Sequence, residues 1–272
     1  MKTVLVTGST DGIGKQTALE LAHEGYRVIV HGRDHSKLKA TIEEIRDRSK
    51  NEEVEGVLGD FASLRDVSRI SAELCSRLEG LNVLINNAGI WNREFTLSKD
   101  GIESTFAVNH LAPFLLTILL LDLITQEKQS RIINVSSMVH ASEIDFENLQ
   151  LTGSYNGSKA YSLSKLCNIL FTYKLADDLK ETGTTVNCLH PGVIGTKLLH
   201  ANWSGGAPVS EGAKTPVYLA TSPEVAGETG KYFVDRKPAK SAPITYDSDV
   251  QKKLWDVSLG FVQYFLSTRG PM

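Results

Sequence analysis

The chain has little cysteine and no long uninterrupted apolar segment. Its three cysteines, Cys75, Cys167 and Cys188, are far apart and form no Cys-x-x-Cys pair, so neither a disulfide framework nor a metal site is expected. The longest apolar run, residues 111–121, contains a proline and a threonine and is much shorter than the ~20 residues of a membrane-spanning helix. The amino terminus leads from a short apolar run into glycines and has no signal-peptide pattern. We therefore expect a cytoplasmic protein without a membrane anchor.

An excess of charge of one sign is also missing. The 272 residues contain 29 lysines and arginines against 32 aspartates and glutamates, a formal net charge of -3. Proteins that bind nucleic acid need clustered cations for the phosphates, so no nucleic-acid partner is expected. The hydrophobic fraction of 41% is enough for a large buried core, which excludes a disordered or collagen-like chain.

Seven short, β-branched apolar runs alternate with longer segments of helical periodicity. The expected strands are 3–6, 27–30, 54–58, 83–85, 131–135, 185–189 and 232–234, and the expected helices are 13–22, 36–48, 64–78, 102–124 and 161–179. The alternation predicts an α/β fold, a single doubly wound Rossmann domain over 1–272 with seven mostly parallel strands and helices on both faces. A substrate loop is expected near 193–212 and a C-terminal helical segment near 248–266. Ligands should bind beyond the carboxyl ends of the strands.

A glycine-rich turn follows the first expected strand. Gly8 permits a tight turn, Gly12 lets the backbone approach a pyrophosphate, and Gly14 lets the next helix pack on the strand. An ordinary strand-to-helix turn is the alternative, but the place at the start of a βαβ pattern favours a dinucleotide-binding loop. The residues expected to contact the cofactor here are Gly8, Ser9, Thr10, Gly12, Ile13 and Gly14.

The end of the second strand bears on the choice between NAD and NADP. An acidic residue there would bind the ribose hydroxyls of NAD and repel a 2′-phosphate. Here the strand-end position is Gly32, followed by Arg33, whose guanidinium can bind a phosphate in a bidentate way. We therefore predict NADP, with NAD less favoured. The alternative is that Arg33 is merely exposed and that Asp34 binds the ribose.

Two further strand ends carry candidate cofactor residues. Asp60 could accept a hydrogen bond from the adenine amino group and Phe61 could cover the base, although Asp60 could equally cap the next helix. After the fourth strand, Asn87, Ala88 and Gly89 are small enough for the cofactor to lie across the strand end, while turn formation is the other interpretation.

A tyrosine and a lysine four residues apart open the helical segment after the fifth strand. This spacing puts Tyr161 and Lys165 on one helix face. A free phenol titrates near ~10, and a neighbouring ammonium favours the phenolate. Bringing that pKa to the neutral range needs roughly 4 kcal/mol, which the lysine and a cationic nicotinamide could supply. Tyr161 would then exchange a proton with a substrate oxygen held by a serine at a strand end.

Together these motifs resemble the short-chain dehydrogenase/reductase family. They are TGSTDGIG, NNAG, Asn109 in AVNH, the pair Ser136-Ser137, YSLSK from Tyr161 and HPG from His190, in the family's order over about residues 3–235. The variants VNHL, SKLCNILF and LHPGV are most similar to the retinol-dehydrogenase-like and carbonyl-reductase-like branch that uses NADP.

The resemblance implies a role for individual residues. Tyr161 is the implied acid/base, Lys165 binds the nicotinamide ribose and lowers the tyrosine pKa, and Ser137 hydrogen-bonds the substrate carbonyl. Asn109 is implied to hold, through its backbone, a water that relays protons to Lys165. The implied neighbours of the nicotinamide are Pro191, Gly192, Val193 and Thr196. The implied reaction interconverts an alcohol and an aldehyde or ketone.

A second pair with the same spacing, Tyr155 and Lys159, competes for the catalytic role. Asn156 and Gly157 are poor residues for a helix interior, whereas Tyr161 leads into a continuous helical face. We therefore favour Tyr161. The long gap after Ser137 then makes residues 143–153 an insertion near the mouth of the site.

The expected substrate is a hydrophobic carbonyl or alcohol. The candidate pocket residues are Trp91, Phe95, His140, Leu198, Leu199 and Trp203, and each could equally belong to the core or rim. Family members often pair through the long helices after the fourth and fifth strands, which implies a homodimer or homotetramer. The competing readings are a non-catalytic dinucleotide-sensing or interaction protein on the same fold, and an epimerase or dehydratase.

Overall fold

One sheet organises the computed structural model, which describes residues 1–201 and 204–267. Its strands lie in the order β3-β2-β1-β4-β5-β6-β7-β8. Their bounds are β1 Thr3–Val6, β2 Arg27–Gly32, β3 Val54–Leu58, β4 Val83–Asn86, β5 Arg131–Val135, β6 Thr185–His190, β7 Lys231–Val234 and β8 Lys237–Ala239. Neighbours from β1 to β7 are parallel, so the predicted doubly wound α/β fold is confirmed.

The sheet has one strand more than the seven predicted. β8 pairs antiparallel with β7 across a turn in which Asp235 and Arg236 have φ angles of 46° and 63°. Two successive residues at positive φ are typical of tight hairpin turns. β8 has only three residues, includes Pro238 and buries none of them fully, so it lacks the apolar pattern that identifies a strand.

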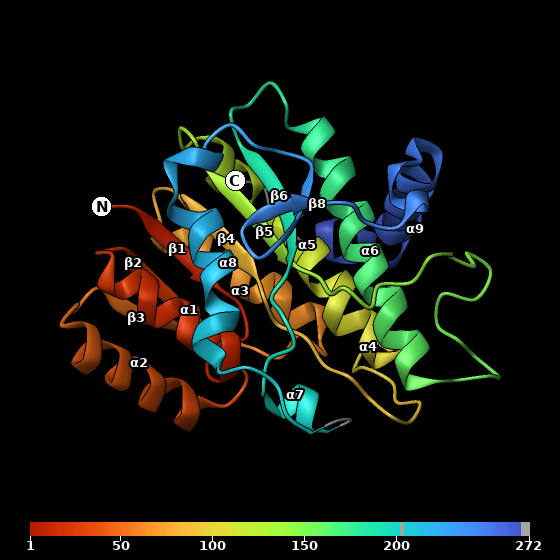
Figure 1. Ribbon diagram of the computed structural model, residues 1–272, viewed down its shortest axis with the longest axis horizontal. Coiled ribbons are helices and arrows are strands. Elements are labelled where there is room, and N and C mark those ends of the chain that lie inside the picture. The colour runs from red at the N-terminus through yellow and green to blue at the C-terminus, as the bar shows by residue number, and fades with distance from the viewer. Residues whose placement is uncertain (202–203, 268–272) are drawn as a thin grey trace.

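Helices cover both faces of the sheet (Figure 1). Their bounds are α1 Gly12–His23, α2 His35–Ser49, α3 Leu64–Arg77, α4 Ser104–Phe106, the π-helical turn η1 Ala107–Leu111, α5 Ala112–Thr125, α6 Gly157–Asp178, α7 Lys197–His200, α8 Val209–Thr221 and α9 Ser248–Ser267, with 3-10 turns η2 Pro223–Val225 and η3 Pro243–Tyr246. Helices α1, α2 and α8 pack together on one face, and α3, α5, α6 and α9 pack on the other. Side chains of β1 alternate between the two faces. Val4 and Val6 pack in the apolar cluster under α1, α2 and α8, and Leu5 packs in the cluster under α3, α5, α6 and α9.

Side-chain caps determine where several helices begin. Asp11, Asp34 and Ser63 each accept a hydrogen bond from a backbone N–H in the first turn of α1, α2 and α3. Asn156 does the same for α6, where its side chain accepts from the Lys159 N–H at 3.0 Å. The helix that carries Tyr161 therefore starts four residues earlier than predicted.

The continuous helical stretch Ser104–Thr125 is long and apolar enough to cross a membrane by composition alone. Its mean hydropathy is 1.9, but 83% of the apolar window is buried inside the fold. The stretch combines α4, η1 and α5, and it contacts α3, α6 and α9. It is a core helix of this domain.

The C-terminal helix α9 packs on the two long helices α5 and α6. Trp255 of α9 meets Phe114 edge-on, with ring centroids 5.1 Å apart, and lies 6.0 Å from Phe171. Beside them, the fully buried His110 ring shares a 2.8 Å hydrogen bond with the hydroxyl of Ser258. An aromatic cluster thus joins α9 to the body of the domain.

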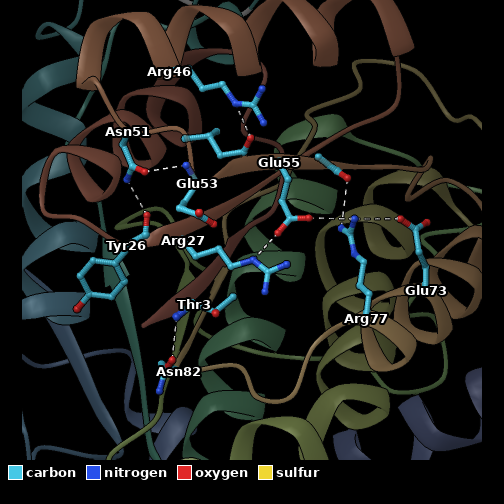
Figure 2. A network of polar contacts seen from close by, with 12 residues as sticks. Thr3, Tyr26, Arg27, Arg46, Asn51, Glu53, Glu55, Glu73, Arg77 and Asn82 are labelled. Atoms are coloured by element: carbon cyan, nitrogen blue, oxygen red, sulfur yellow. Dashed lines mark hydrogen bonds and ion pairs between the residues drawn. The ribbon is translucent and has the colours of Figure 1, made fainter. Parts of the chain in front are cut away.

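A network of charged and polar side chains closes the amino-terminal edge of the sheet (Figure 2). Glu55 pairs with Arg27 through one carboxylate oxygen and with Arg77 through the other, and Arg77 also reaches Glu73. Asn82 accepts a hydrogen bond from the Thr3 N–H at 2.8 Å. Thr3, Arg27 and Glu55 lie at the starts of β1, β2 and β3, so the network lies at the opposite end of the strands from their carboxyl ends.

Candidate active site

The loops after β1 to β6 surround a cleft of about 790 Å³ at the carboxyl ends of the strands. This is the edge at which the sequence predicted ligand binding. Of the predicted cofactor residues, these line the cleft: Gly8, Thr10, Gly12, Ile13, Gly14, Arg33, Asp60, Phe61, Asn87, Ala88, Gly89, Tyr161, Lys165, Pro191, Gly192, Val193 and Thr196. Among the described residues, no group of three or more His, Cys, Asp or Glu side chains could hold a metal ion.

The glycine-rich loop fits a dinucleotide pyrophosphate. Gly8 has a φ of 62°, and a Cβ there would lie 2.8 Å from the Cα of Ala88. A Cβ on Gly14 would overlap the Asn87 amide and lie 2.5 Å from the carbonyl oxygen of Gly8. Asn87 in turn donates to the Thr7 carbonyl at 2.8 Å, which fixes the loop against the end of β4. The cradle exists only because side chains are absent, and it leads directly into the amino end of α1.

Ser9, predicted to contact the cofactor, is held away from the cleft. Ser9 is fully buried and does not line the cleft. Its hydroxyl donates to the Val6 carbonyl at 2.6 Å and accepts from the His31 N–H at 2.9 Å. Both hydrogen bonds turn the side chain into the loop, because the tight turn at Gly8 leaves those backbone groups unpaired.

The end of β2 presents an arginine and no carboxylate to the cleft. Asp34 does not line the cleft, because its side chain caps α2 by accepting from the Lys37 N–H at 2.9 Å. A Cβ on Gly32 would overlap the Thr10 methyl group, so the strand-end position has no room for a side chain. Arg33 lines the cleft.

Asp60 follows β3 and lines the same end of the cleft. Its carboxylate accepts from the Ala62 N–H at 3.0 Å and pairs with Lys99 at 3.0 Å, so it closes a turn. The cap of α3 is Ser63, whose hydroxyl accepts from the Asp66 N–H at 3.2 Å. The alternative interpretation of Asp60 as a helix cap is therefore wrong.

Three polar side chains meet at the other end of the cleft. Ser137, beyond the end of β5, and Tyr161 on α6 both line this end of the cleft, and the serine hydroxyl is close enough to the phenol to lower its pKa. Lys165, one turn further along α6, donates to the Val135 carbonyl at 2.9 Å. Its Nζ lies 5.5 Å from the centre of the Tyr161 ring. The structure thus brings together the serine, tyrosine and lysine that the sequence singled out.

Burial shifts the proton affinities of both titratable members. The pKa of Tyr161 is raised to about 12, chiefly because burial disfavours the phenolate, while the Ser137 hydroxyl opposes that shift. The pKa of Lys165 is lowered to about 8, because burial disfavours the ammonium. At neutral pH the tyrosine therefore carries its proton and the lysine is mostly charged.

Asn109 lies in the π-helical turn η1 and behind the cleft wall. It is fully buried and does not line the cleft. Its side chain accepts from the Ile90 N–H at 2.8 Å and donates to the Ile90 carbonyl at 2.9 Å and the Ser164 hydroxyl at 3.0 Å. These bonds join the loop after β4 to α6, immediately beside Lys165.

Trp91 covers one face of the tyrosine. The Trp91 and Tyr161 rings are stacked at 4.4 Å with an angle of 8° between their planes. Trp91, Leu198 and Leu199 all line the cleft, as the sequence predicted for the substrate pocket.

Two other predicted pocket residues are placed elsewhere, and a third falls outside the described residues. Phe95 is 42% exposed and packs edge-on against Tyr155, away from the cleft. His140 shares a 2.7 Å hydrogen bond with the Ser137 carbonyl and accepts from the Ala242 N–H at 3.0 Å, so its ring braces the loop after β5 and does not line the cleft. Trp203 lies outside the residues that the structure describes.

Several lining residues were not predicted. They are Asp11, His31, Gly59, Ile90, Val108, Val135, Ser136, Met138, Val139, His190, Ile194, Lys197 and Ser204, along with Gly32. Most directly precede or follow a predicted site residue at the end of a strand. The sequence signal that could have identified them is therefore their position at the carboxyl end of a predicted strand.

The competing Tyr155 is a bracing residue. It lies before α6, and its hydroxyl donates to the Asn92 carbonyl at 3.0 Å and lies 3.3 Å from a Glu103 carboxylate oxygen. Lys159 is exposed. Neither residue lines the cleft, which agrees with the preference for Tyr161.

Comparison with known proteins places this site in a family. Residues 2–205 match the family model described as short chain dehydrogenase. The chain is 42% identical to mouse retinol dehydrogenase 14 over 282 residues, covering 94% of this chain and 84% of that protein.

Solved structures agree. A protein of Mycobacterium paratuberculosis superimposes with a TM-score of 0.81 at 31% identity, covering 97% of this chain and 94% of that one. A short chain dehydrogenase of Burkholderia cenocepacia in complex with NADP gives a TM-score of 0.68 at 25% identity, over 85% and 95% of the two chains. The fold is one that binds a nicotinamide dinucleotide. The chain therefore belongs to the short-chain dehydrogenase family, within which it is similar to the retinol dehydrogenases, and is an oxidoreductase acting on CH–OH donors.

Proposed function

We propose that the protein interconverts an alcohol and an aldehyde or ketone on a hydrophobic substrate, with NADP(H) as its cofactor. The observation that carries this proposal is the proximity of Ser137, Tyr161 and Lys165 in a cleft that begins at a glycine-rich phosphate loop. The bound dinucleotide would supply or accept the hydride.

The chain's own residues would handle the proton and the substrate oxygen. Tyr161, protonated at neutral pH, would donate its proton to a carbonyl oxygen during reduction and take it back during oxidation. The Ser137 hydroxyl would hydrogen-bond that oxygen, since it lines the cleft beside the phenol. Lys165 would bind ribose hydroxyls and favour the phenolate through its charge.

The preference for NADP rests on the end of β2. Arg33 lines the cleft, and Gly32 offers no carboxylate that would repel a 2′-phosphate. Asp34, the residue that could have bound the ribose hydroxyls of NAD, caps α2 instead. Replacing Arg33 with alanine should therefore weaken NADPH binding while leaving NADH binding almost unchanged, as measured by fluorescence titration.

The proposed hydrophobic substrate rests on the lining near Tyr161. The apolar side chains at this end of the cleft are Ile90, Trp91, Val108, Met138, Val139, Val193, Ile194, Leu198 and Leu199. Such a surface favours an apolar body attached to the reacting carbon.

The test is the oxidation of NADPH and of NADH against a panel of apolar aldehydes and ketones. Tyr161→Phe should abolish turnover and keep dinucleotide binding, whereas Tyr155→Phe, on the same side of the site but outside the cleft, should retain turnover. NADPH binding by the wild type without turnover on any carbonyl would favour the dinucleotide-sensing alternative. Activity that survives in Tyr161→Phe and is lost in Tyr155→Phe would reverse the assignment of the acid/base.

A further inference from the structure

One buried histidine joins the ends of three neighbouring strands. His31 is the last residue but one of β2, which lies between β1 and β3 in the sheet. It is only 4% exposed, yet it lines the cleft. Its Nδ1 is 3.0 Å from the Gly8 N–H after β1, and its Nε2 is 3.0 Å from the Gly59 carbonyl oxygen after β3.

These two partners fix where the imidazole carries its proton. The Gly8 N–H can only donate and the Gly59 carbonyl can only accept, so Nδ1 is the acceptor and Nε2 carries the hydrogen. Both hydrogen bonds form together only with a neutral ring. Burial lowers the pKa of His31 to about 4, which keeps the ring neutral over the physiological range.

The backbone of the same residue strengthens the connection. The Ser9 N–H donates to the His31 carbonyl at 2.9 Å, and the His31 N–H donates to the Ser9 hydroxyl at 2.9 Å. The ring also stacks on Phe61, with centroids 4.3 Å apart and an angle of 28° between the planes. His31 therefore contacts both the phosphate loop and the phenyl ring that lines the adenosine end of the cleft.

We propose that His31 is a positioning residue for the adenosine and pyrophosphate half of the dinucleotide. It holds Gly8 of the phosphate loop and Phe61 beyond β3 at a fixed separation, so that the two binding elements are preorganised before the dinucleotide arrives. The proposal rests on the proposed function in one respect, the use of this cleft by NADP(H).

A pair of substitutions separates the two hydrogen bonds of the ring. In His31→Asn the amide oxygen can take the place of Nδ1 and accept from Gly8, but nothing reaches Gly59. In His31→Gln the longer side chain can donate to Gly59 while leaving Gly8 unpaired. His31→Ala removes both, and the Asn and Gln variants keep the test decisive if the Ala variant fails to fold.

The experiment is calorimetric titration of the full chain with NADPH and with 2′,5′-ADP, a probe of the adenosine half alone. His31→Gln and His31→Ala should bind both ligands about tenfold more weakly than the wild type, and His31→Asn should stay within about threefold. The factor lost should be the same for NADPH and for 2′,5′-ADP. The kcat of each variant, extrapolated to saturating NADPH, should match that of the wild type. The KM for NADPH should rise in the variants that bind it more weakly.

Three outcomes would overturn the inference. One is wild-type affinity in both Ala and Gln variants. Another is a larger loss of affinity for NADPH than for 2′,5′-ADP, which would mean that the substitution disrupts the whole cleft. The third is equal weakening in the Asn and Gln variants. If the wild type itself binds neither ligand, the proposed function fails, and this result is distinct from a wild type that binds normally beside unaffected His31 variants.

Discussion

Replacing Lys165 with methionine isolates the electrostatic part of the proposed mechanism. The side chain is 4% exposed, donates to the Val135 carbonyl at 2.9 Å and lies 5.5 Å from the centre of the Tyr161 ring. Methionine fills a similar volume and carries no charge. The change therefore removes the ammonium beside the phenol with little loss of packing.

The expected size of the effect follows from that separation. A unit charge 5.5 Å from the centre of the tyrosine ring, at an effective dielectric constant of about 20, stabilises the negative charge of the phenolate by about 3 kcal/mol. This corresponds to roughly two units in the pKa of Tyr161 and to about a hundredfold change in the phenolate population. Because burial lowers the pKa of Lys165 to about 8, the ammonium is present below that pH and is lost above it.

The assay is the rate of alcohol oxidation at saturating dinucleotide, measured from about pH 6.5 to about pH 9.5. Lys165→Met should be about a hundredfold slower than the wild type at pH 7, and the gap should narrow above pH 8 as the wild-type lysine loses its charge. Lys159→Met, an exposed lysine on the same helix, is the matched control and should match the wild type. A gap of constant size across the whole pH range would refute the electrostatic argument.

Four further outcomes follow from the structure. Gly14→Ala should abolish measurable NADPH binding, because the new Cβ would lie 2.5 Å from the Gly8 carbonyl oxygen. Gly260→Ala, in α9 with nothing within 4 Å of the new Cβ, should instead raise the free energy of unfolding by roughly 0.5–1 kcal/mol in urea denaturation. Glu55→Gln breaks the pairing with Arg27 and Arg77 at the amino-terminal edge, and should lower the free energy of unfolding by about 1 kcal/mol with KM unchanged. Burial lowers the pKa of His31, His110 and His190 to about 4, so the unfolded chain binds more protons than the folded one between about pH 6.5 and 4. The thermal midpoint should fall steeply over that interval and stay nearly flat from pH 6.5 to 7.5; a flat profile down to pH 4.5 would contradict this assignment.

The parallel strands could be predicted from the sequence because each is a short run with mainly apolar residues. β1, β3 and β5 begin and end where expected; every residue of β1 and β5 is buried, whereas β3 is fully buried only at Val54 and Val57. β8 could not be predicted, since it depends on a hairpin turn at Asp235 and Arg236 and on no apolar pattern of its own.

The site was predictable where residue type alone carries the function. Gly8 and Gly14 fall at the cleft because a Cβ at either position would collide with neighbouring atoms, and Tyr161 and Lys165 line the cleft as their spacing on one helix face predicted. Ser9 and His140 do not line the cleft, because both side chains hydrogen-bond backbone groups whose positions depend on the folded loops. The same reason hides His31, whose position between Gly8 and Gly59 follows from the strand order alone.

The packing of α9 has a consequence for synthesis of the chain on the ribosome. α9 follows every strand of the sheet in the sequence, so the whole Rossmann core is made before the helix that covers α5 and α6. Until Trp255 emerges, the aromatic faces of Phe114 and Phe171 have no cover from α9, and His110 lacks the Ser258 hydroxyl. A nascent or truncated chain ending before Ser248 would expose an aggregation-prone aromatic surface next to the turn that holds Asn109.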